Sequence, residues 1–450
     1  MENRLAGRNG GRLGLAALVA ILLLGLGLRV GEAWDGRPPV YDAGAYAAIA
    51  ANLERGDGFT VGPAATQPSS NYSPGLPLLL AGVYEVTGGV HERTARVLLA
   101  LIGTLAVLFA YLIGRRLSRR SMHPPRSGVV NRTNAVAGLI GALAVAIYPA
   151  LLEYQGMTMS EPLAATLLAA GVLSLLWARD PGAASWRWIL PGLLLGALTL
   201  IRPEYLAVSV LLAVVVFAVE ARADWRRGLA QAAILLAGLV VVLAPWAVRN
   251  AIALDRFVPV STGGGQVLFA GTYLPSDGDP ERVGEEVVDR HPELFGPHAV
   301  ERLRLEQILA RLAAARYPEL ETDQALSRMG REQLWDDITE EPLEFAGFVA
   351  TKTGRIWSHG PRDVMREPLW EALHWALVAF GLLGLAILAW RRRWEALVLA
   401  TIFLSITAIS ALLVASPRRV LVMIPLVAAL GGCGVTWLWK TARPDSLSRP

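Results

Sequence analysis

Long apolar runs, separated by short polar segments, dominate the chain. An apolar helix of about 20 residues crosses a bilayer, and runs near that length are interpreted as spans. The ten candidates are 13–33, 95–114, 133–151, 162–178, 187–201, 204–220, 228–247, 368–390, 394–414 and 419–439. The pattern therefore predicts an all-α polytopic membrane protein with about ten transmembrane helices.

A shorter apolar run, 74–86, contains Pro74 and Pro77. If it crossed the membrane, the arginine-rich loop 115–132 would face outward, against the preference of basic loops for the cytoplasm. If it lies at the outer surface instead, every strongly basic short loop falls on one side. We therefore predict that both termini are cytoplasmic and that outer juxtamembrane helices lie between the first and second spans.

This topology places the longer polar segments on the outer side. The first outer loop, 34–94, belongs to a predicted N-terminal transmembrane module, 1–248. A segment rich in Glu, Arg, Leu and Ala, 249–366, is predicted to be a small, mostly helical extracytoplasmic insertion, and 367–450 a C-terminal transmembrane module. The candidate chemistry described below all falls on this outer face.

Composition supports this interpretation and excludes several functions. The chain is 54% hydrophobic and 18% charged, which is too apolar for an ordinary soluble protein. It has no nucleotide-binding phosphate loop, and its six histidines lack metal-ligand spacing. Nothing in the sequence indicates nucleic-acid binding, and a divalent cation as cofactor has no support from it.

Two acidic residues at predicted outer span ends are candidate catalytic groups. Asp42 follows the first span, where a partly desolvated carboxylate can accept a proton from a substrate hydroxyl. Glu161 precedes Pro162 at the start of another span. The alternative for both is structural, because Asp at an N-cap and Glu in a first turn stabilise a helix.

Basic residues at outer span ends are candidate substrate ligands. They are Arg202, Arg249, Arg418 and Arg419. Positive charge there opposes the insertion preference unless an anion pairs with it, and guanidinium groups bind phosphate in bidentate fashion. Snorkelling to lipid head groups is the alternative. Lys352, on a predicted interfacial helix, and the aromatic Tyr46 are further candidate substrate-binding residues.

Short motifs in this order resemble those of the GT-C class of membrane glycosyltransferases. Within that class they resemble bacterial relatives of protein O-mannosyltransferases and lipid A aminoarabinose transferase, which are glycosyltransferase family 39-like. The motifs are Asp42-Ala43-Gly44-Ala45-Tyr46 in the first outer loop, the proline-rich segment 72–81, Ser160-Glu161-Pro162, the segment 245–262, and Ser416-Pro417-Arg418-Arg419 at the last span.

The resemblance implies an inverting transfer of a hexosyl or pentosyl unit from a polyprenyl-phosphate donor to a lipid, glycan or protein acceptor. It implies that Asp42 is the base, that Arg249, Arg418 and Arg419 meet the lipid phosphate, and that Glu161 holds acceptor or metal. Some relatives bind a divalent ion through an acid before the proline of the juxtamembrane helix, where this chain has Tyr72 and Ser73. We therefore predict no metal ligand, and we expect a bacterial-type plasma membrane location with an extracytoplasmic active site.

Two other classes of function are weighed against this one. A transporter or flippase of a lipid-linked saccharide would carry polar residues or broken helices near the midplane, whereas these span interiors are almost free of ionisable groups. A ligase of undecaprenyl-linked glycans is a second alternative. A phosphoethanolamine-type transferase is a third, but it would need a cluster of His and Asp ligands that the sequence does not contain.

Overall fold

The computed structural model describes residues 2–36, 42–61, 68–121, 129–276, 279, 282–296, 298–358 and 360–442. Within these residues the secondary structure is entirely helical, as predicted. Tyr41 of the first outer loop, part of the basic loop 115–132, and the tail after residue 442 lie outside the described residues.

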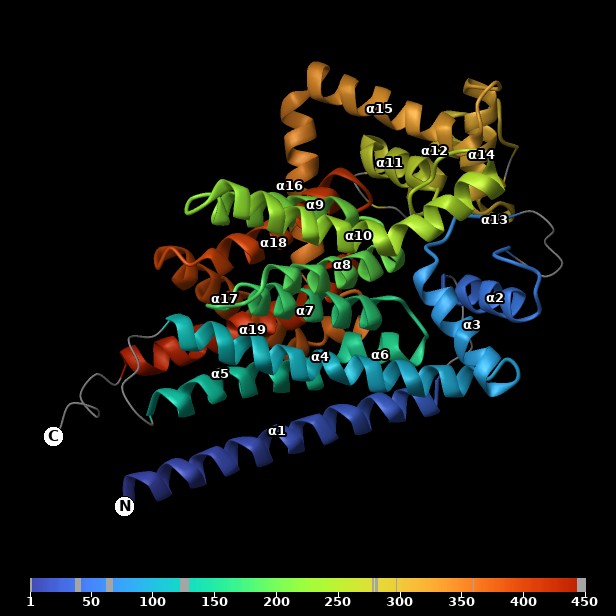
Figure 1. The fold of residues 1–450 in the computed structure, drawn as a ribbon. Helices are drawn as coiled ribbons and strands as arrows, with labels where there is room; N and C mark the ends of the chain where they lie inside the picture. The colour runs from blue at the N-terminus through green and yellow to red at the C-terminus, as the bar shows by residue number, and fades with distance from the viewer. Residues whose placement is uncertain are drawn as a thin grey trace.

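Seven described helices are long and apolar enough to cross a membrane. Figure 1 shows most of them side by side, with their axes in similar directions. They are α1 (Glu2–Trp34), α4 (Glu92–Ser121), α7 (Glu161–Ala178), α10 (Trp225–Leu254), α17 (Pro368–Trp390), α18 (Trp394–Leu412) and α19 (Arg418–Thr441). The chain is therefore a multi-pass membrane protein.

The other three predicted spans are helical but do not meet the same criterion singly. The run 133–151 is divided between α5 (Val129–Ala146) and α6 (Pro149–Gly156), which are bent by 47°. The short η1 (Ser185–Trp188) leads into α8 (Ile189–Ile201), and α9 is Tyr205–Glu220; both are shorter apolar helices. The predicted total of about ten spans is thus not confirmed.

The break between α5 and α6 is stabilised by a buried arginine. Pro149 has no N–H, so the Val145 carbonyl loses its usual helical donor. The Arg29 guanidinium donates to the carbonyl oxygens of Val145 at 3.0 Å and Ala146 at 3.2 Å, and its residue is only 2% exposed. A charge within α1 therefore replaces the backbone donor that proline removes.

Close backbone contacts hold α19 against its neighbours. A Cβ atom on Gly432 would lie 2.0 Å from the Ala137 carbonyl oxygen of α5, and one on Gly434 would lie 2.4 Å from the Phe380 carbonyl oxygen of α17. Small residues at such contacts let spanning helices approach closely, which gives the packing that associates helices in lipid. Most of α19 is buried as a result, and it forms the centre of the bundle.

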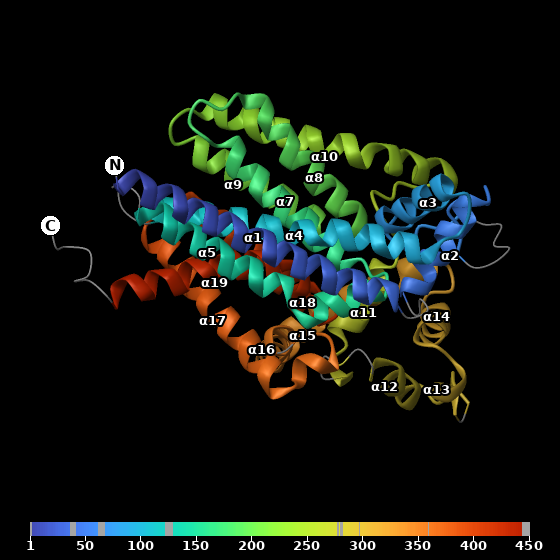
Figure 2. The same cartoon turned by 90° about the horizontal axis from the view of Figure 1, so that it is seen from below.

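Outside the bundle lie α2 (Asp42–Glu54), α3 (Gly75–Thr87) and the insertion. The insertion contains α11 (Gly264–Thr272), η2 (Leu274–Ser276), α12 (Val283–Arg290), α13 (Ala299–Arg302), α14 (Leu305–Arg316), α15 (Thr322–Glu340), α16 (Pro342–Ser358) and η3 (Asp363–Arg366). It has a small hydrophobic core of its own, which includes Phe269, Val287 and Leu309. Figures 1 and 2 show α2, α3 and α12 to α14 at one end of the molecule, opposite the start of α1 and the end of α19.

Replacing Arg29 tests the role of the helix break. We expect Arg29→Ala to lower the melting temperature of the detergent-solubilised protein, because two buried carbonyl groups lose their hydrogen-bond donor. Each unsatisfied buried group lowers the free energy of unfolding by about 1 to 3 kcal/mol. Arg12→Ala is the matched control, since Arg12 is exposed on the same helix. Equal melting temperatures for the two variants would contradict the capping role.

Candidate active site

Six charged side chains at the ends of helices form a series of ion pairs of alternating sign. We call them the charge network: Asp42, Arg418, Glu161, Arg202, Glu204 and Arg419. They come from the first turns of α2, α7 and α19 and from the turn between α8 and α9. Three carboxylates balance three guanidinium groups.

Arg418 is the centre of the exposed part of the network. Its Nη1 donates to Asp42 Oδ2 at 2.8 Å, and its Nε donates to Glu161 Oε1 at 2.5 Å. Hydrogen bonds between ionised groups are short and about twice as strong as neutral ones. The guanidinium also lies over the Tyr154 ring, 5.8 Å from its centroid. Arg418 thus fixes the position of both predicted catalytic acids.

The inner part of the network continues through weaker contacts. Arg202 Nη2 lies 3.6 Å from Glu161 Oε1, and Arg202 Nε lies 3.4 Å from Glu204 Oε1. Arg419 Nε lies 3.6 Å from the same Glu204 oxygen. Because Glu161 and Glu204 each lie between two arginines, every charge in this inner part of the network has an opposite neighbour.

Exposure separates the two predicted catalytic acids. The Glu161 side chain has 0% exposure, whereas the Asp42 side chain is 39% exposed. Among the described residues, no donor contacts the second Asp42 oxygen, Oδ1. Asp42 is therefore able to meet a substrate hydroxyl, and Glu161 acts through the arginines that it holds.

Aromatic side chains surround Asp42. Tyr46, one turn further along α2, packs edge to face against Tyr72, with ring centroids 5.9 Å apart. Burial, and then the charge of Asp42, raise the pKa of Tyr46 to about 12. Its hydroxyl therefore stays protonated at neutral pH. The structure thus brings the predicted residue Tyr46 close to the network.

A second ion pair, missed in the sequence, lies beside Tyr154. Arg362 Nε donates to Glu153 Oε2 at 2.6 Å, and this hydrogen bond raises the pKa of the Arg362 guanidinium. Arg362 stands near the end of the insertion, 209 positions from its partner. Its only sequence signal is a positive charge on the predicted outer side, shortly before α17.

Arg249 has different contacts from the network. Its Nη1 donates to the Ser69 carbonyl at 2.9 Å and its Nη2 to the Phe59 carbonyl at 3.3 Å, and its guanidinium lies 4.9 Å from the Trp246 ring centroid. These contacts tie the first outer loop to α10. They favour a role for Arg249 in positioning this loop, and contact between Arg249 and a lipid phosphate stays a prediction.

Lys352 does not fit its predicted substrate-binding role. Its residue has 0% exposure, and its Nζ donates to the Gly271 carbonyl at 2.5 Å and lies 4.7 Å from the Phe348 ring centroid. Burial lowers its pKa to about 7. The sequence indicated an interfacial helix with Lys352 on its polar face, but α16 packs this residue inward against α11.

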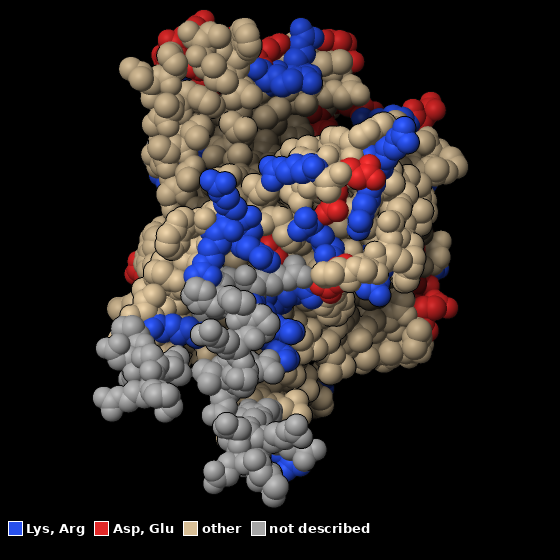
Figure 3. Space-filling view, turned by 60° about the vertical axis from the view of Figure 1, so that its left-hand side comes forward, with Lys and Arg blue, Asp and Glu red and all other residues tan. Residues whose placement is uncertain are grey.

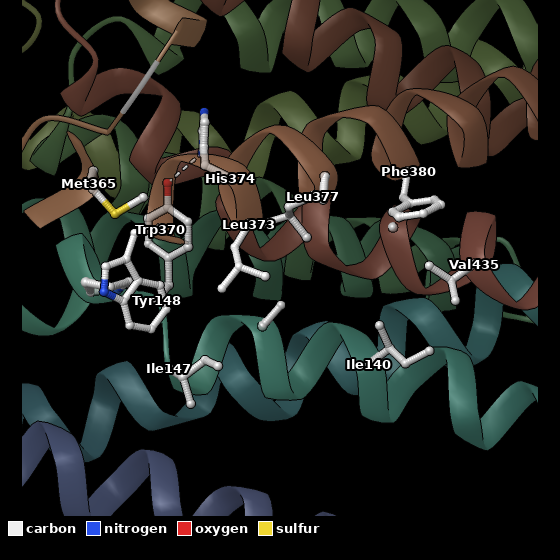
Figure 4. Close-up of a pocket in the computed structure, with 14 residues that line it drawn as sticks. Ile140, Ile147, Tyr148, Met365, Trp370, Leu373, His374, Leu377, Phe380 and Val435 are labelled. Carbon is white, nitrogen blue, oxygen red and sulfur yellow. Dashed lines mark hydrogen bonds between the residues drawn. The ribbon is translucent and has the colours of Figure 1, made fainter. Parts of the chain in front are cut away.

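An apolar pocket of about 180 Å³ lies between α5, α17 and α19 (Figure 4). Its lining is almost entirely hydrocarbon and includes Ile140, Leu377 and Val435. At one end, the Tyr148 hydroxyl lies 2.9 Å from His374 Nδ1. Tyr148 and Met365 at this end stand only a few positions from Glu153 and Arg362, so the pocket begins close to that ion pair.

The described residues contain no group of three or more His, Cys, Asp or Glu side chains that could hold a metal ion. The acids of the network are instead paired with arginines. The chemistry that this site supports without further groups is therefore proton transfer at Asp42 and anion binding by guanidinium groups.

No protein-family model and no curated protein matches the chain. Solved structures of the oligosaccharyltransferase AglB from Archaeoglobus fulgidus match the chain. The complex with an inhibitory peptide and a dolichol-phosphate matches with a TM-score of 0.56 and 18% identity, over 97% of this chain and 52% of that chain. The apo form matches with a TM-score of 0.57 and 17% identity, over 96% and 51%.

The chain has the fold of the GT-C glycosyltransferases. It spans about half the length of the AglB structures. A lower TM-score, 0.37, relates it to ArnT from Cupriavidus metallidurans bound to undecaprenyl phosphate, at 16% identity over 96% of this chain and 78% of that chain. In this fold, the charge network lies at the helix ends near α2.

Glu161 tests the structural part of the network. We expect Glu161→Gln to destabilise the protein by about 3 to 5 kcal/mol, because removing one partner of a buried ion pair leaves the other charge uncompensated. The measurement is thermal unfolding in detergent. Asp57→Asn is the control, since Asp57 pairs with Arg55 at the surface, where ion pairs contribute about 0 to 1 kcal/mol. Similar small losses in both variants would show that the buried pair is not structural.

Proposed function

We propose that the protein is an inverting glycosyltransferase that moves a hexosyl or pentosyl unit from a polyprenyl-phosphate donor to an acceptor hydroxyl. The observation that carries this proposal is the geometry of Asp42. It is an accessible carboxylate with one oxygen held by Arg418 and the other without a donor among the residues that the structure describes. The GT-C fold supports the same conclusion, but only at the level of fold.

The reaction is a single displacement. The acceptor hydroxyl attacks the anomeric carbon while Asp42 Oδ1 takes its proton, and the bond from that carbon to the phosphate oxygen breaks. The lipid phosphate leaves with the bonding electrons. A general base acts from hydrogen-bond distance of the proton that it removes, which the exposure of Asp42 permits. Attack from the face opposite the leaving group inverts the anomeric configuration.

The leaving phosphate needs a cation on the far side of the sugar from Asp42. Arg418 already pairs with two carboxylates, and Arg419 is mostly buried. Arg362 is better placed, because it belongs to the ion pair beside Tyr154 and is about a quarter exposed. We assign the phosphate to Arg362, while Arg418 holds the base Asp42.

The part of the donor's lipid chain next to the phosphate occupies the apolar pocket between α5, α17 and α19. The pocket is lined by hydrocarbon within the membrane-spanning helices, and its polar end lies close to the Glu153–Arg362 pair. A polyprenyl phosphate has matching chemistry, with an apolar chain and an anionic head. A transporter gains no support here, because this pocket offers no polar path and buried Arg29 caps a helix instead of lining one.

The orientation proposed from the sequence places both termini in the cytoplasm and the active site on the extracytoplasmic side of a plasma membrane. Figure 3 brings forward the end of the molecule that carries the start of α1, and basic side chains gather on it. Such clustering is typical of cytoplasmic surfaces. The acceptor, whether lipid, glycan or protein, then approaches from the end formed by α2 and the insertion.

Removing the base tests the proposed reaction. We expect Asp42→Asn to lower transfer from a polyprenyl-phosphate sugar by about 10²- to 10⁴-fold, which is the usual contribution of a general base. Donor binding should change little. Asp57→Asn, another acid of the outer loop, serves as the control. Transfer near the wild-type rate in a folded Asp42→Asn protein would rule out this base.

Filling the apolar pocket tests the donor site. Ala144 lines it and the neighbouring Leu143 is exposed on the outside of the same helix. We expect Ala144→Phe to raise the KM for the lipid donor at least several-fold, because the new ring takes the space of the chain, while Leu143→Phe has no effect. If both variants keep the wild-type KM, the lipid chain lies elsewhere.

A further inference from the structure

A second cavity, of about 670 Å³, lies in the insertion, among α11, α12, α14 and α15. Its volume is within the range of small-molecule sites. The apolar part includes Phe269 and Tyr273, whose stacked rings have centroids 5.3 Å apart. The polar part includes Arg290, Arg316 and Gln333. Ring surface together with a few converging polar groups is the usual composition of a ligand site.

The two arginines of the cavity lining differ in their partners. Arg316 pairs with Glu332 at 3.4 Å, and Glu293 lies 3.1 Å from His291. Arg290, in contrast, has no acidic partner among the described residues. Gln333 accepts a hydrogen bond from Thr272 through its Oε1, so its amide N–H groups are left to donate. A ligand with an anionic group and several hydroxyls has the chemistry that these residues lack.

Helix α14 connects this cavity to the neighbourhood of Asp42. Near its start, the charges of Arg304 and Glu306 act on the Tyr72 hydroxyl, whose pKa is raised first by burial and then by Asp42. Leu312, Ala315 and Arg316, near the end of the same helix, line the cavity. Nine residues separate Glu306 from Ala315, which corresponds to about 14 Å along a helix. A single sugar does not cover this distance, whereas a short oligosaccharide does.

We propose that the cavity is a distal acceptor subsite for an anionic sugar unit, such as a uronate, within an oligomeric glycan acceptor. This inference rests on the proposed glycosyltransferase function, and it specifies the acceptor class. Arg290 and Arg316 bind the carboxylate, and Gln333 donates to a ring hydroxyl. The apolar face of the sugar packs on Leu294 and Ala315, which line the cavity and are not buried. The reactive end of the glycan then lies at Asp42.

A glycan fits these observations better than an acidic peptide does. Extended peptides bind by adding a strand to an exposed sheet edge, and the described part of the insertion is helical, without such an edge. A carboxylate beside ring hydroxyls suits a guanidinium fork with a neutral donor nearby, and the cavity lining offers Arg290 and Gln333, besides Arg316 and the His291–Glu293 pair. The acidic peptide becomes one outcome of the test.

The test measures binding of trigalacturonate to the full chain in detergent, without lipid donor, by calorimetry. Neutral galactotriose and an acidic hexapeptide are the comparison probes. We expect wild-type protein to bind trigalacturonate at least tenfold more tightly than either. Arg290→Gln should weaken that binding at least tenfold, whereas Arg331→Gln, an exposed arginine of α15 outside the cavity lining, should leave it unchanged.

A steric pair tests the same site independently of charge. Ala315 lines the cavity and the adjacent Ala314 is exposed outside it. Ala315→Trp should abolish trigalacturonate binding and Ala314→Trp should preserve it. Any of three results would overturn the proposal. The first is no trigalacturonate binding by the wild-type protein at millimolar concentration, and the second is tighter binding of the peptide by that protein. The third result is equal trigalacturonate binding by the two members of each variant pair.

Failure of the subsite and failure of the proposed function give different results. Asp42→Asn should bind trigalacturonate as the wild type does, because the base lies outside the cavity. If that variant stays active in transfer while Arg290→Gln loses binding, the reaction assignment is wrong and the cavity still binds anionic saccharide. If Asp42→Asn is inactive and Arg290→Gln binds normally, the reaction stands and the subsite does not.

Discussion

Neutralisation of charge at the edge of the membrane is the constraint on which this structure depends. Ionised side chains at the ends of spanning helices are costly unless opposite charges meet them. In the charge network, each guanidinium or carboxylate inside the chain has an opposite neighbour, from Asp42 through Arg418 and Glu161 to Arg202. Because these residues come from α2, α7, the α8–α9 turn and α19, pairing them fixes how four distant segments meet.

The same pairing separates structural from chemical roles. Glu161 is enclosed and holds two arginines, so it sets the position of Arg418 without meeting solvent. Asp42 lies at the exposed end of the charge network and accepts a hydrogen bond from only one nitrogen of Arg418. If Asp42 is the base that we propose, its arrangement, held on one side by Arg418 and open on the other, needs little reorganisation when an acceptor hydroxyl arrives, which is what preorganised catalysis requires.

Hydropathy predicted the helices, and the placement of acids and arginines at their outer ends predicted most of the network. Contacts between residues far apart in the sequence could not be predicted. A hydropathy pattern shows which residues lie at a helix end, but it does not show which other residue each of them contacts. The pairing of Glu153 with Arg362 and the use of Arg29 at the Pro149 break depend on the tertiary arrangement. The burial of Lys352 could not be predicted for the same reason, since helix packing decided which face of α16 was buried, and its role in substrate binding stays a prediction.

Inversion places a geometric demand on the site that the ion pairs help to meet. The attacking hydroxyl and the leaving phosphate must lie on opposite faces of the anomeric carbon, so one guanidinium cannot serve both the base and the phosphate. Tyr154 is close to Arg418 on one side, and the charge of Arg362 also acts on it. A sugar held beside Tyr154 would therefore lie near both the Arg418–Asp42 pair and the Arg362 cation. The division of labour between these two arginines therefore follows from the stereochemistry that we propose.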